Sequence, residues 1–306
     1  MRQETWGIGL RILSGLLFTL MIASIKAIGD GAALGQVVFF RSAVAVVPLV
    51  LFLWWRAEFP AGLATRRPWG HLRRCVLGGA AMFTSFASLR FLPIAEATML
   101  AYLSPVMVVA LAATLLGERA GPRSWLGVVL GLAGVAALTV PRFGAGEAHL
   151  IGIALGVATA ALTAGALIQL RALAVSENPG AIAFYFALFS AIAGLATWPF
   201  GWLPVDGTTL VLLVLSGLLG GAAHIAMTLS FRYAEASVLA PFEYLTILWA
   251  TSAGFLLFAE VPASAFLMAA PLVIAGAVVA STQEHRPAPK TRTAPQCNRC
   301  LPGPGS

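Results

Sequence analysis

Charged residues and cysteines are scarce in this chain of 306 residues. Only 10% of its residues are charged, whereas a soluble protein carries about a quarter, so water is not its main solvent. The three cysteines, Cys75, Cys297 and Cys300, indicate no disulfide framework. Cys297 and Cys300 alone cannot complete a tetrahedral zinc site, and we interpret them as part of a solvated tail.

Motifs of enzymes, ATP-driven pumps and channels are also missing. The sequence contains no HExxH, no GxSxG and no phosphate-binding GxxxxGK[ST]. We therefore expect no catalytic residue, no metal and no cofactor, and any transport must draw on a gradient. A channel would show rings of charge or a repeated filter sequence, and neither is visible. An integral-membrane lipid-modifying enzyme stays open as the alternative from a different class.

Long apolar runs fill most of the chain, with 59% hydrophobic residues and a mean hydropathy of +0.89. The runs approach the roughly 20 residues that span a bilayer as a helix, and each helix satisfies its own backbone in lipid. The sequence therefore predicts an all-α membrane protein with about ten transmembrane helices. The predicted spans are Ile8–Ile28, Gln36–Trp55, Cys75–Leu92, Ala97–Leu116, Trp125–Val140, Leu150–Leu170, Ala181–Phe200, Leu210–Phe231, Ser237–Phe258 and Ala265–Ser281.

Basic residues gather in the connections on one side of these spans. If the N-terminus lies in the cytoplasm, the outer connections hold only Lys26, Arg90 and Arg142, as the positive-inside rule requires. The inner side collects Arg56, Arg66, Arg67, Arg73, Arg74, Arg119, Arg123, Arg171, Arg232, Arg286, Lys290 and Arg292. We expect the cell inner (cytoplasmic) membrane with both termini cytoplasmic, and the net charge of +7 then indicates no nucleic-acid partner.

The second half of the chain repeats the first in outline. Ala95-Glu96-Ala97-Thr98 recurs as Ala234-Glu235-Ala236-Ser237, and Glu118 and Gly134 share the spacing of Glu260 and Gly276. Five helices in each repeat would make the second repeat enter the membrane from the opposite face. The predicted units are residues 1–145, residues 146–283 and a flexible cytoplasmic tail, 284–306. Phe39-Phe40 aligns with Phe184-Tyr185, which makes Phe186 the equivalent of Arg41.

These repeated motifs, with Phe39-Phe40-Arg41 and Pro241-Phe242-Glu243-Tyr244, resemble the EamA-type members of the drug/metabolite transporter superfamily. The resemblance covers the chain from about Gly7 to Ser281. It implies a ten-helix secondary carrier of small metabolites such as amino acids. It also implies a central cavity lined mainly by helices 1, 3, 4, 6, 8 and 9.

Ionisable residues inside spans are functional candidates, because an unpaired charge in lipid costs several kcal/mol. Glu243 and His224 have matching predicted depths in helices nine and eight, so they could pair or carry a proton. Alternatively, Glu243 caps backbone freed by Pro241. Arg41 in helix two has a planar fork for a carboxylate, and a structural salt bridge to another helix is the favoured interpretation. Lys26 and Arg90 near span ends are expected to snorkel to the interface; alternatively, either could flank the outer mouth.

Polar and aromatic residues in other spans complete the predicted transport cavity, although packing explains each aromatic equally simply. The further cavity candidates are Tyr102, Ser104, Phe83, Phe86, Gln169, Tyr244 and Trp249. Prolines and glycines in the same spans would allow bending between two access states. The predicted hinges are Gly78, Gly79, Pro105, Gly220, Gly221 and Pro241. Gly127, Gly131 and Gly134, with Gly276, form a small-residue pattern that favours close helix packing.

Together these features predict an inner-membrane secondary transporter, with export of an amino-acid-like metabolite as the preferred direction. Import or exchange of a nucleoside-like cofactor, such as a sulfonium metabolite, is the alternative. The expected partners are a small-molecule substrate and the lipid bilayer. Proton coupling and the choice between monomer and homodimer stay open.

Overall fold

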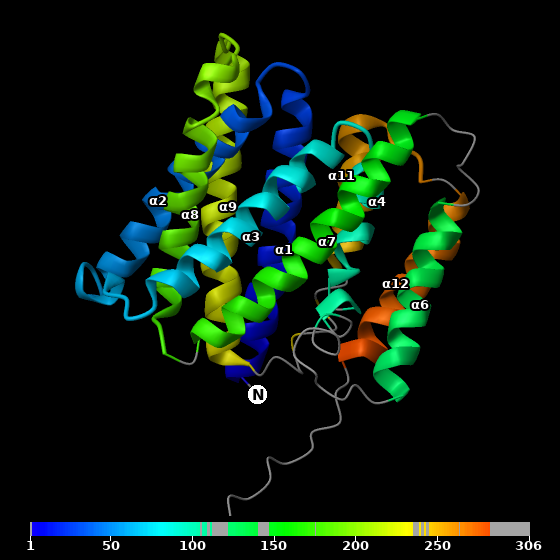
Figure 1. Ribbon diagram of the computed structural model, residues 1–306, viewed down its shortest axis with the longest axis horizontal. Coiled ribbons are helices and arrows are strands. Elements are labelled where there is room, and N and C mark those ends of the chain that lie inside the picture. Colours follow the sequence, from blue (N-terminus) through cyan, green and yellow to red (C-terminus); the bar gives the residue numbers. More distant parts are fainter. Residues whose placement is uncertain are drawn as a thin grey trace, which may run out of the picture.

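The computed structural model describes residues 2–104, 106–108, 111, 122–139, 147–174, 176–234, 239, 242, 245–262 and 264–281. Every regular element in these residues is a helix, as predicted (Figure 1). The elements are α1 (Arg2–Ile28), α2 (Leu34–Trp55), η1 (Ala61–Leu63), α3 (Pro68–Ser88), α4 (Ile94–Ala101), α6 (Pro122–Thr139), α7 (Glu147–Ala174), α8 (Pro179–Leu195), η3 (Trp198–Phe200), α9 (Gly207–Tyr233), α11 (Leu245–Phe258) and α12 (Ser264–Ser281).

The start of α3 differs clearly from the prediction. This helix begins at Pro68 rather than Cys75, because proline fits the first turn, where its missing N–H leaves no bond unmade. Local caps explain two other starts. The Asn178 side chain accepts a hydrogen bond from the Gly180 N–H at α8, and Asp206 accepts one from the Thr209 N–H at α9.

Five described helices are long and apolar enough to cross a membrane, namely α1, α2, α7, α8 and α9. Shorter apolar helices lie at 94–108, 125–137, 245–258 and 264–276. Many large apolar side chains point outward, including Trp54, Leu256 and Met268. Outward-facing apolar residues on so many helices are expected when lipid is the solvent.

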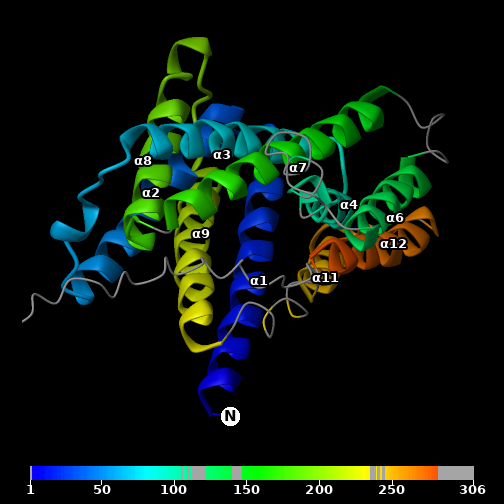
Figure 2. The same cartoon turned by 60° about the horizontal axis from the view of Figure 1, so that its bottom comes forward.

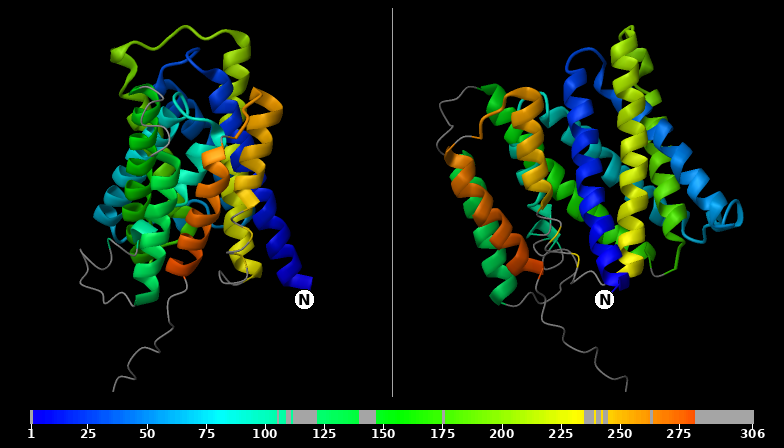
Figure 3. Two further views of the ribbon diagram at one scale, coloured as in Figure 1. Left: turned by 90° about the vertical axis from the view of Figure 1, so that its right-hand side faces the viewer. Right: turned by 180° about the vertical axis from the view of Figure 1, so that it is seen from behind.

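The packing of the helices repeats itself across the molecule. Helix α1 packs along α9, and α3 packs in the same way along α7 (Figures 2 and 3). Helix α2 packs on α8, α4 on α11, and α6 on α12. The counterparts of α1, α2, α3, α4 and α6 in the second half are α7, α8, α9, α11 and α12. With these counterparts, the α1–α9 pair corresponds to the α7–α3 pair, and each of the other three pairs corresponds to itself. The two sets of five helices therefore occupy equivalent places, as expected of an internal duplication.

Small residues bring the paired helices together. A Cβ on Gly276 would lie 2.5 Å from the Gly131 nitrogen, and one on Gly134 would lie 2.6 Å from a Val273 methyl carbon. The predicted small-residue pattern thus joins α6 to α12 within one chain. Between lipid-exposed helices, such close approach increases dispersion contacts, which are the main attraction available in a membrane.

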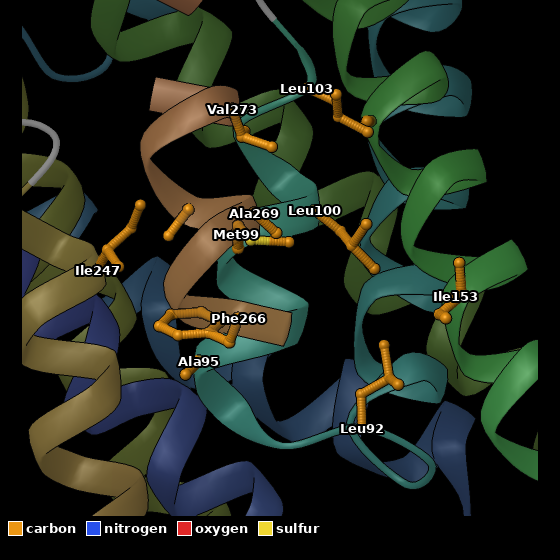
Figure 4. Packing of buried hydrophobic residues seen from close by; sticks show 12 residues of the cluster. Leu92, Ala95, Met99, Leu100, Leu103, Ile153, Ile247, Phe266, Ala269 and Val273 are labelled. Atoms are coloured by element: carbon orange, nitrogen blue, oxygen red, sulfur yellow. The ribbon is translucent and has the colours of Figure 1, made fainter. Parts of the chain in front are cut away.

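A buried cluster fixes the position of α4 beside α12. Met99 and Leu100 of α4 lie against Ala269 and Val273 of α12, and Ile247 of α11 completes the cluster (Figure 4). These side chains are at most 5% exposed. The cluster is filled by apolar side chains, so it serves packing rather than passage of a polar solute.

The bundle has two faces with different connections. The amino-terminal face is the end where α1 begins, α2 ends, α3 begins and α9 ends (Figure 3). The last turn of α12 lies at the same face. The opposite face holds the end of α1 and the end of α11.

Candidate functional site

A cavity of about 500 Å³ lies between α2, α3, α7, α8 and α9. It reaches Arg56, which follows the last residue of α2 at the amino-terminal face. None of its described lining residues is an aspartate or a glutamate. The lining comprises Arg41, Ala45, Leu49, Arg56, Arg74, Leu170, Ile182, Ala183, Phe186, Ala187, His224, Met227, Thr228 and Leu229.

Arg41 is the most buried charged residue of the described lining. Its side chain extends from α2, and the residue is only 4% exposed. A Cβ on Gly220 of α9 would lie 3.3 Å from Arg41 Nε, so this glycine leaves space for the guanidinium. Arg41 Nε is buried without a hydrogen-bond partner. The salt bridge to another helix that the sequence favoured is not formed with any described carboxylate.

Arg74 contributes a second guanidinium from α3. Its Cζ lies 4.6 Å from the centre of the Phe186 ring of α8, a cation–π contact. A Cβ on Gly78 would overlap Arg74 Nη1, so Gly78 makes space here as Gly220 does for Arg41. Arg74 Nε and Nη1 are buried and have no hydrogen-bond partner. The ring holds this cation in place without neutralising it.

His224 of α9 lies beside Arg41. Its Nε2 is 3.4 Å from Arg41 Nη2, and the edge of its ring meets Phe18 at a centroid distance of 5.1 Å. Arginine has only donors, so a hydrogen bond here requires His224 Nε2 to accept. The imidazole that fits this contact is therefore neutral and carries its proton on Nδ1.

Arg56 differs from the deeper arginines because it has a partner. Its Nε lies 2.9 Å from Glu58 Oε1, and its Cζ lies 5.7 Å from the Phe52 ring centre. Two smaller hollows of about 130 and 190 Å³ also reach Arg56. The cavity thus has a charge-balanced residue at its mouth and unbalanced ones inside.

At the opposite face, Lys26 joins three segments. Its Nζ forms an ion pair with Glu260 after α11 and donates a hydrogen bond to the Leu92 carbonyl oxygen, at 2.8 Å. Glu260 Oε2 in turn accepts a bond of 3.0 Å from the Ile94 N–H at the start of α4. The expected snorkelling of Lys26 is wrong, since its side chain is 17% exposed and paired.

The loops of the amino-terminal face are also joined. Glu177, before α8, accepts a hydrogen bond of 3.0 Å from the Arg66 N–H and lies 3.3 Å from His71 Nε2. Burial acts to raise the pKa of Glu177, but hydrogen bonds from Arg66, Thr65 and His71 outweigh it and hold that pKa below its ordinary value. The α2–α3 and α7–α8 connections are therefore held together by a carboxylate.

Other predicted site residues lie away from this cavity. Phe86 packs with Phe83 in a buried cluster that includes Met21 and Leu89. Tyr102 packs beside the α4–α12 cluster, and Ser104 is 9% exposed nearby in the chain. Trp249 of α11 and Gln169 of α7 are partly buried. Trp249 Nε1 has no hydrogen-bond partner. The described lining of the cavity includes none of the six predicted residues Phe83, Phe86, Tyr102, Ser104, Gln169 and Trp249.

Four predicted residues, Glu243, Tyr244, Pro105 and Pro241, lie outside the described residues. The proposed pairing of Glu243 with His224 therefore stays a prediction. Gly79 and Gly221 are described. A Cβ on Gly79 would lie 3.6 Å from a Phe189 ring carbon, whereas one on Gly221 would overlap Pro48 of α2. The close approach to Pro48 gives Gly221 a role in packing α9 against α2.

Sequence reasoning missed Arg74 because it assigned this residue to a loop. Pro68 was the available signal, since proline at a first helical position places Arg74 two turns inside a helix. The cavity also differs from the one implied by resemblance. Helices α2 and α8, which correspond to the second and seventh predicted spans, line it. Helices α1, α4 and α11, which correspond to the first, fourth and ninth predicted spans, contribute none of its described lining.

Comparison with known proteins identifies similar chains. The model of the EamA-like transporter family matches residues 5–140. The chain is 31% identical over 228 residues to a riboflavin transporter of Rhizobium johnstonii, covering 74% of each chain. It is 28% identical over 283 residues to the pseudopaline exporter CntI of Pseudomonas aeruginosa, covering 90% of this chain and 95% of that protein.

Two further similarities are more distant. An S-adenosylmethionine uptake transporter of Rickettsia felis is 24% identical over 268 residues, with 88% of this chain and 90% of that protein covered. A solved crystal structure aligns with a TM-score of 0.62 at 21% identity, covering 90% of this chain and 96% of that one. At this identity the structure supports the fold alone.

Proposed function

Because this chain belongs to the EamA-like transporters of the drug/metabolite transporter superfamily, we propose that it exports a small organic metabolite by alternating access. Its class is that of a multi-pass membrane transporter, and its relatives are transporters rather than membrane enzymes. The solute, the direction and the route through the α2–α3–α7–α8–α9 cavity are our proposal.

The cavity is the observation that carries this proposal. Its volume of about 500 Å³ falls within the range of small-molecule sites. Helices from both predicted repeats line it, since α2 and α3 belong to the first and α7, α8 and α9 to the second. The cavity reaches the amino-terminal face at Arg56, while Lys26 and Glu260 join helices at the opposite face. This arrangement fits a carrier that is open to one side.

Export is the direction that basic residues favour. Arg56, Arg67 and Arg73 are exposed at the amino-terminal face, so the positive-inside rule assigns this face to the cytoplasm. A cavity that reaches this face would receive solute from inside the cell. We propose the inner membrane as the location, with both termini cytoplasmic. Of the three relatives described above, the pseudopaline exporter aligns over the longest segment.

Uptake or exchange of a sulfonium metabolite is the second candidate. It is favoured by the S-adenosylmethionine uptake transporters among the relatives, at 24% identity. The two unpaired arginines of the cavity oppose it, because a sulfonium group is cationic and like charges repel in a medium of low dielectric constant.

A transport measurement tests the proposal. Metabolites would be measured inside cells and in the medium with and without overexpression of the chain, and each enriched compound would then be tested for flux in liposomes containing the purified protein. We expect at least one compound to leave the cells faster and to cross these liposomes. Absence of any flux in both systems would contradict the proposal, and uptake without release would favour the second candidate.

A further inference from the structure

We infer that the transported solute carries an oxyanion, a carboxylate or a phosphate, which binds to Arg41 and Arg74 inside the cavity. The inference rests on the proposed function and names the class of its substrate. For brevity, Arg41, Arg74 and His224 are called the arginine site.

Unused donors are the first argument. Arg41 Nε, Arg74 Nε and Arg74 Nη1 are buried and have no hydrogen-bond partner, and both side chains line the same cavity. A guanidinium keeps its proton under all physiological conditions, so it cannot escape the cost of burial by becoming neutral. Buried donors without partners are rare in folded proteins. A bound anion would satisfy them and would supply the missing negative charge.

Neighbouring groups in the described part of the chain do not supply that negative charge. No described lining residue is acidic. His224 can accept from Arg41 Nη2 only while it is neutral, so it orients this guanidinium and leaves its charge intact. Phe186 supports Arg74 through its ring face, which stabilises a cation but provides no hydrogen-bond acceptor. The two guanidinium groups are thus held in place with donors available to a ligand.

Guanidinium geometry selects the kind of ligand. The planar fork of arginine matches the two oxygens of a carboxylate or phosphate, and such bidentate bonds are stronger than those between neutral groups. A lone ammonium or an amide on the solute would not neutralise these charges. Most other lining residues are apolar, such as Leu49, Ile182 and Met227. The remainder of the solute should therefore be largely apolar.

Removal of an anion through this site needs no coupled ion. If the amino-terminal face is cytoplasmic, a solute with one negative charge leaves a cell whose interior is negative. The membrane potential therefore favours this movement. The chain contains no motif of an ATP-driven pump, so this driving force is consistent with its sequence.

A binding experiment tests the inference with probes that share one phenyl ring. Benzoate and phenyl phosphate carry the two oxyanions, and benzamide and benzylamine are their neutral and cationic counterparts. Binding to the purified full chain in detergent would be measured by isothermal titration calorimetry and by the shift in thermal unfolding. We expect one or both anions to bind, with benzamide and benzylamine at least tenfold weaker.

Variants locate the binding. Arg41→Gln and Arg74→Gln should each weaken anion binding at least tenfold, whereas Arg73→Gln should leave it unchanged, because Arg73 is exposed one position before Arg74. Arg41→Lys, which keeps the charge without the fork, should bind with intermediate affinity. Size-exclusion profiles equal to that of the parent protein would exclude misfolding as the cause.

The outcomes separate this inference from the proposed function. Equal binding of benzoate and benzamide, no anion binding at all, or unchanged affinity in both glutamine variants would overturn the inference. If transport occurs but the exported compounds are neutral or cationic, the proposed function stands and the inference fails. If no compound is transported, the proposed function fails, while the anion titration still decides whether the arginine site binds oxyanions. The relative affinity of benzoate and phenyl phosphate indicates which oxyanion the site prefers.

Discussion

Lys26 at the opposite face and Arg41 in the cavity are both cations inside a helical bundle, but among the described residues only Lys26 has an acidic partner. Lys26 pairs with Glu260 and donates to the Leu92 carbonyl oxygen. Arg41 contacts one imidazole nitrogen at 3.4 Å and leaves Nε unbonded. The difference indicates that the first charge joins helices, whereas the second is available to a ligand.

The cost of burial explains why this difference matters. A buried ion pair can be neutral for stability, but removal of one partner destabilises a protein because an uncompensated charge is left. An unpaired buried cation is already in that unfavourable state. Natural proteins retain such strain where function requires it.

The largest expected effect comes from fixing the opposite face. In a chain without Cys75, Cys297 and Cys300, cysteines in place of Lys26 and Glu260 should be joined by a short, reducible thiol crosslinker, since the native side chains bridge this gap. Flux in liposomes should fall to background after crosslinking, because the opposite face can then no longer open, and it should return after reduction. Each single-cysteine variant is the control. Full flux through the crosslinked double variant would contradict alternating access.

Removing each cation should have opposite effects on stability. Lys26→Met leaves Glu260 without its counter-charge and should lower the free energy of unfolding by about 3 kcal/mol. Arg41→Met replaces an unpaired buried charge by an apolar chain and should raise it by about 1 kcal/mol or more, while transport is lost. Thermal and denaturant unfolding in one detergent would measure both. Destabilisation of similar size in the two variants would mean that Arg41 is as well paired as Lys26.

Adding one methyl group should distinguish space for arginine from flexibility. Gly78→Ala would overlap Arg74 Nη1, so we expect about a tenfold loss of transport. Gly79→Ala would make only an ordinary contact of 3.6 Å with Phe189, and we expect transport within twofold of the parent. Both glycines were predicted hinges, and alanine restricts the backbone equally at each. Similar losses in the two variants would therefore favour the hinge interpretation.

The smallest effect concerns the carboxylate that joins the loops of the amino-terminal face. The native pKa of Glu177 lies below its ordinary value, so its stabilising contribution is complete above the unfolded pKa of about 4.3. That contribution decreases as pH falls through the native pKa. The melting temperature should therefore decrease modestly between about pH 5 and pH 3. The decrease should be smaller in Glu177→Gln, and an identical pH profile in both proteins would assign it to other groups.

The sequence was sufficient to predict the fold class because apolar runs and the repeat carry their own signals. Hydrophobic length predicts a span irrespective of its neighbours. The predicted start of α3 was wrong because the charges of Arg73 and Arg74 led to their assignment to a loop. Pro68 allows the helix to begin earlier. The charge of a residue does not decide whether it lies in a helix, and here the charged residues Arg73 and Arg74 are helical.

The site was predicted only in part. Arg41 and His224 could be selected because an ionisable residue in the middle of a span needs a reason. Their contact with each other, and that of Arg74 with Phe186, depends on how helices far apart in sequence pack together. The same holds for Lys26 and Glu260, where a single sequence contains no signal of the pairing. The aromatic candidates Phe83 and Phe86 lie in a packed cluster, since apolar rings are equally suited to packing.

The ammonium group of Lys26 connects α1, the α3–α4 connection and the segment after α11 through one nitrogen atom. If α1 moves away, it leaves both other segments at the same moment. Movement of α1 at this end should therefore break the two contacts together. In a carrier that works by the proposed alternating access, such a joint release would keep this end closed until α1 separates, which would limit leakage of ions during each cycle.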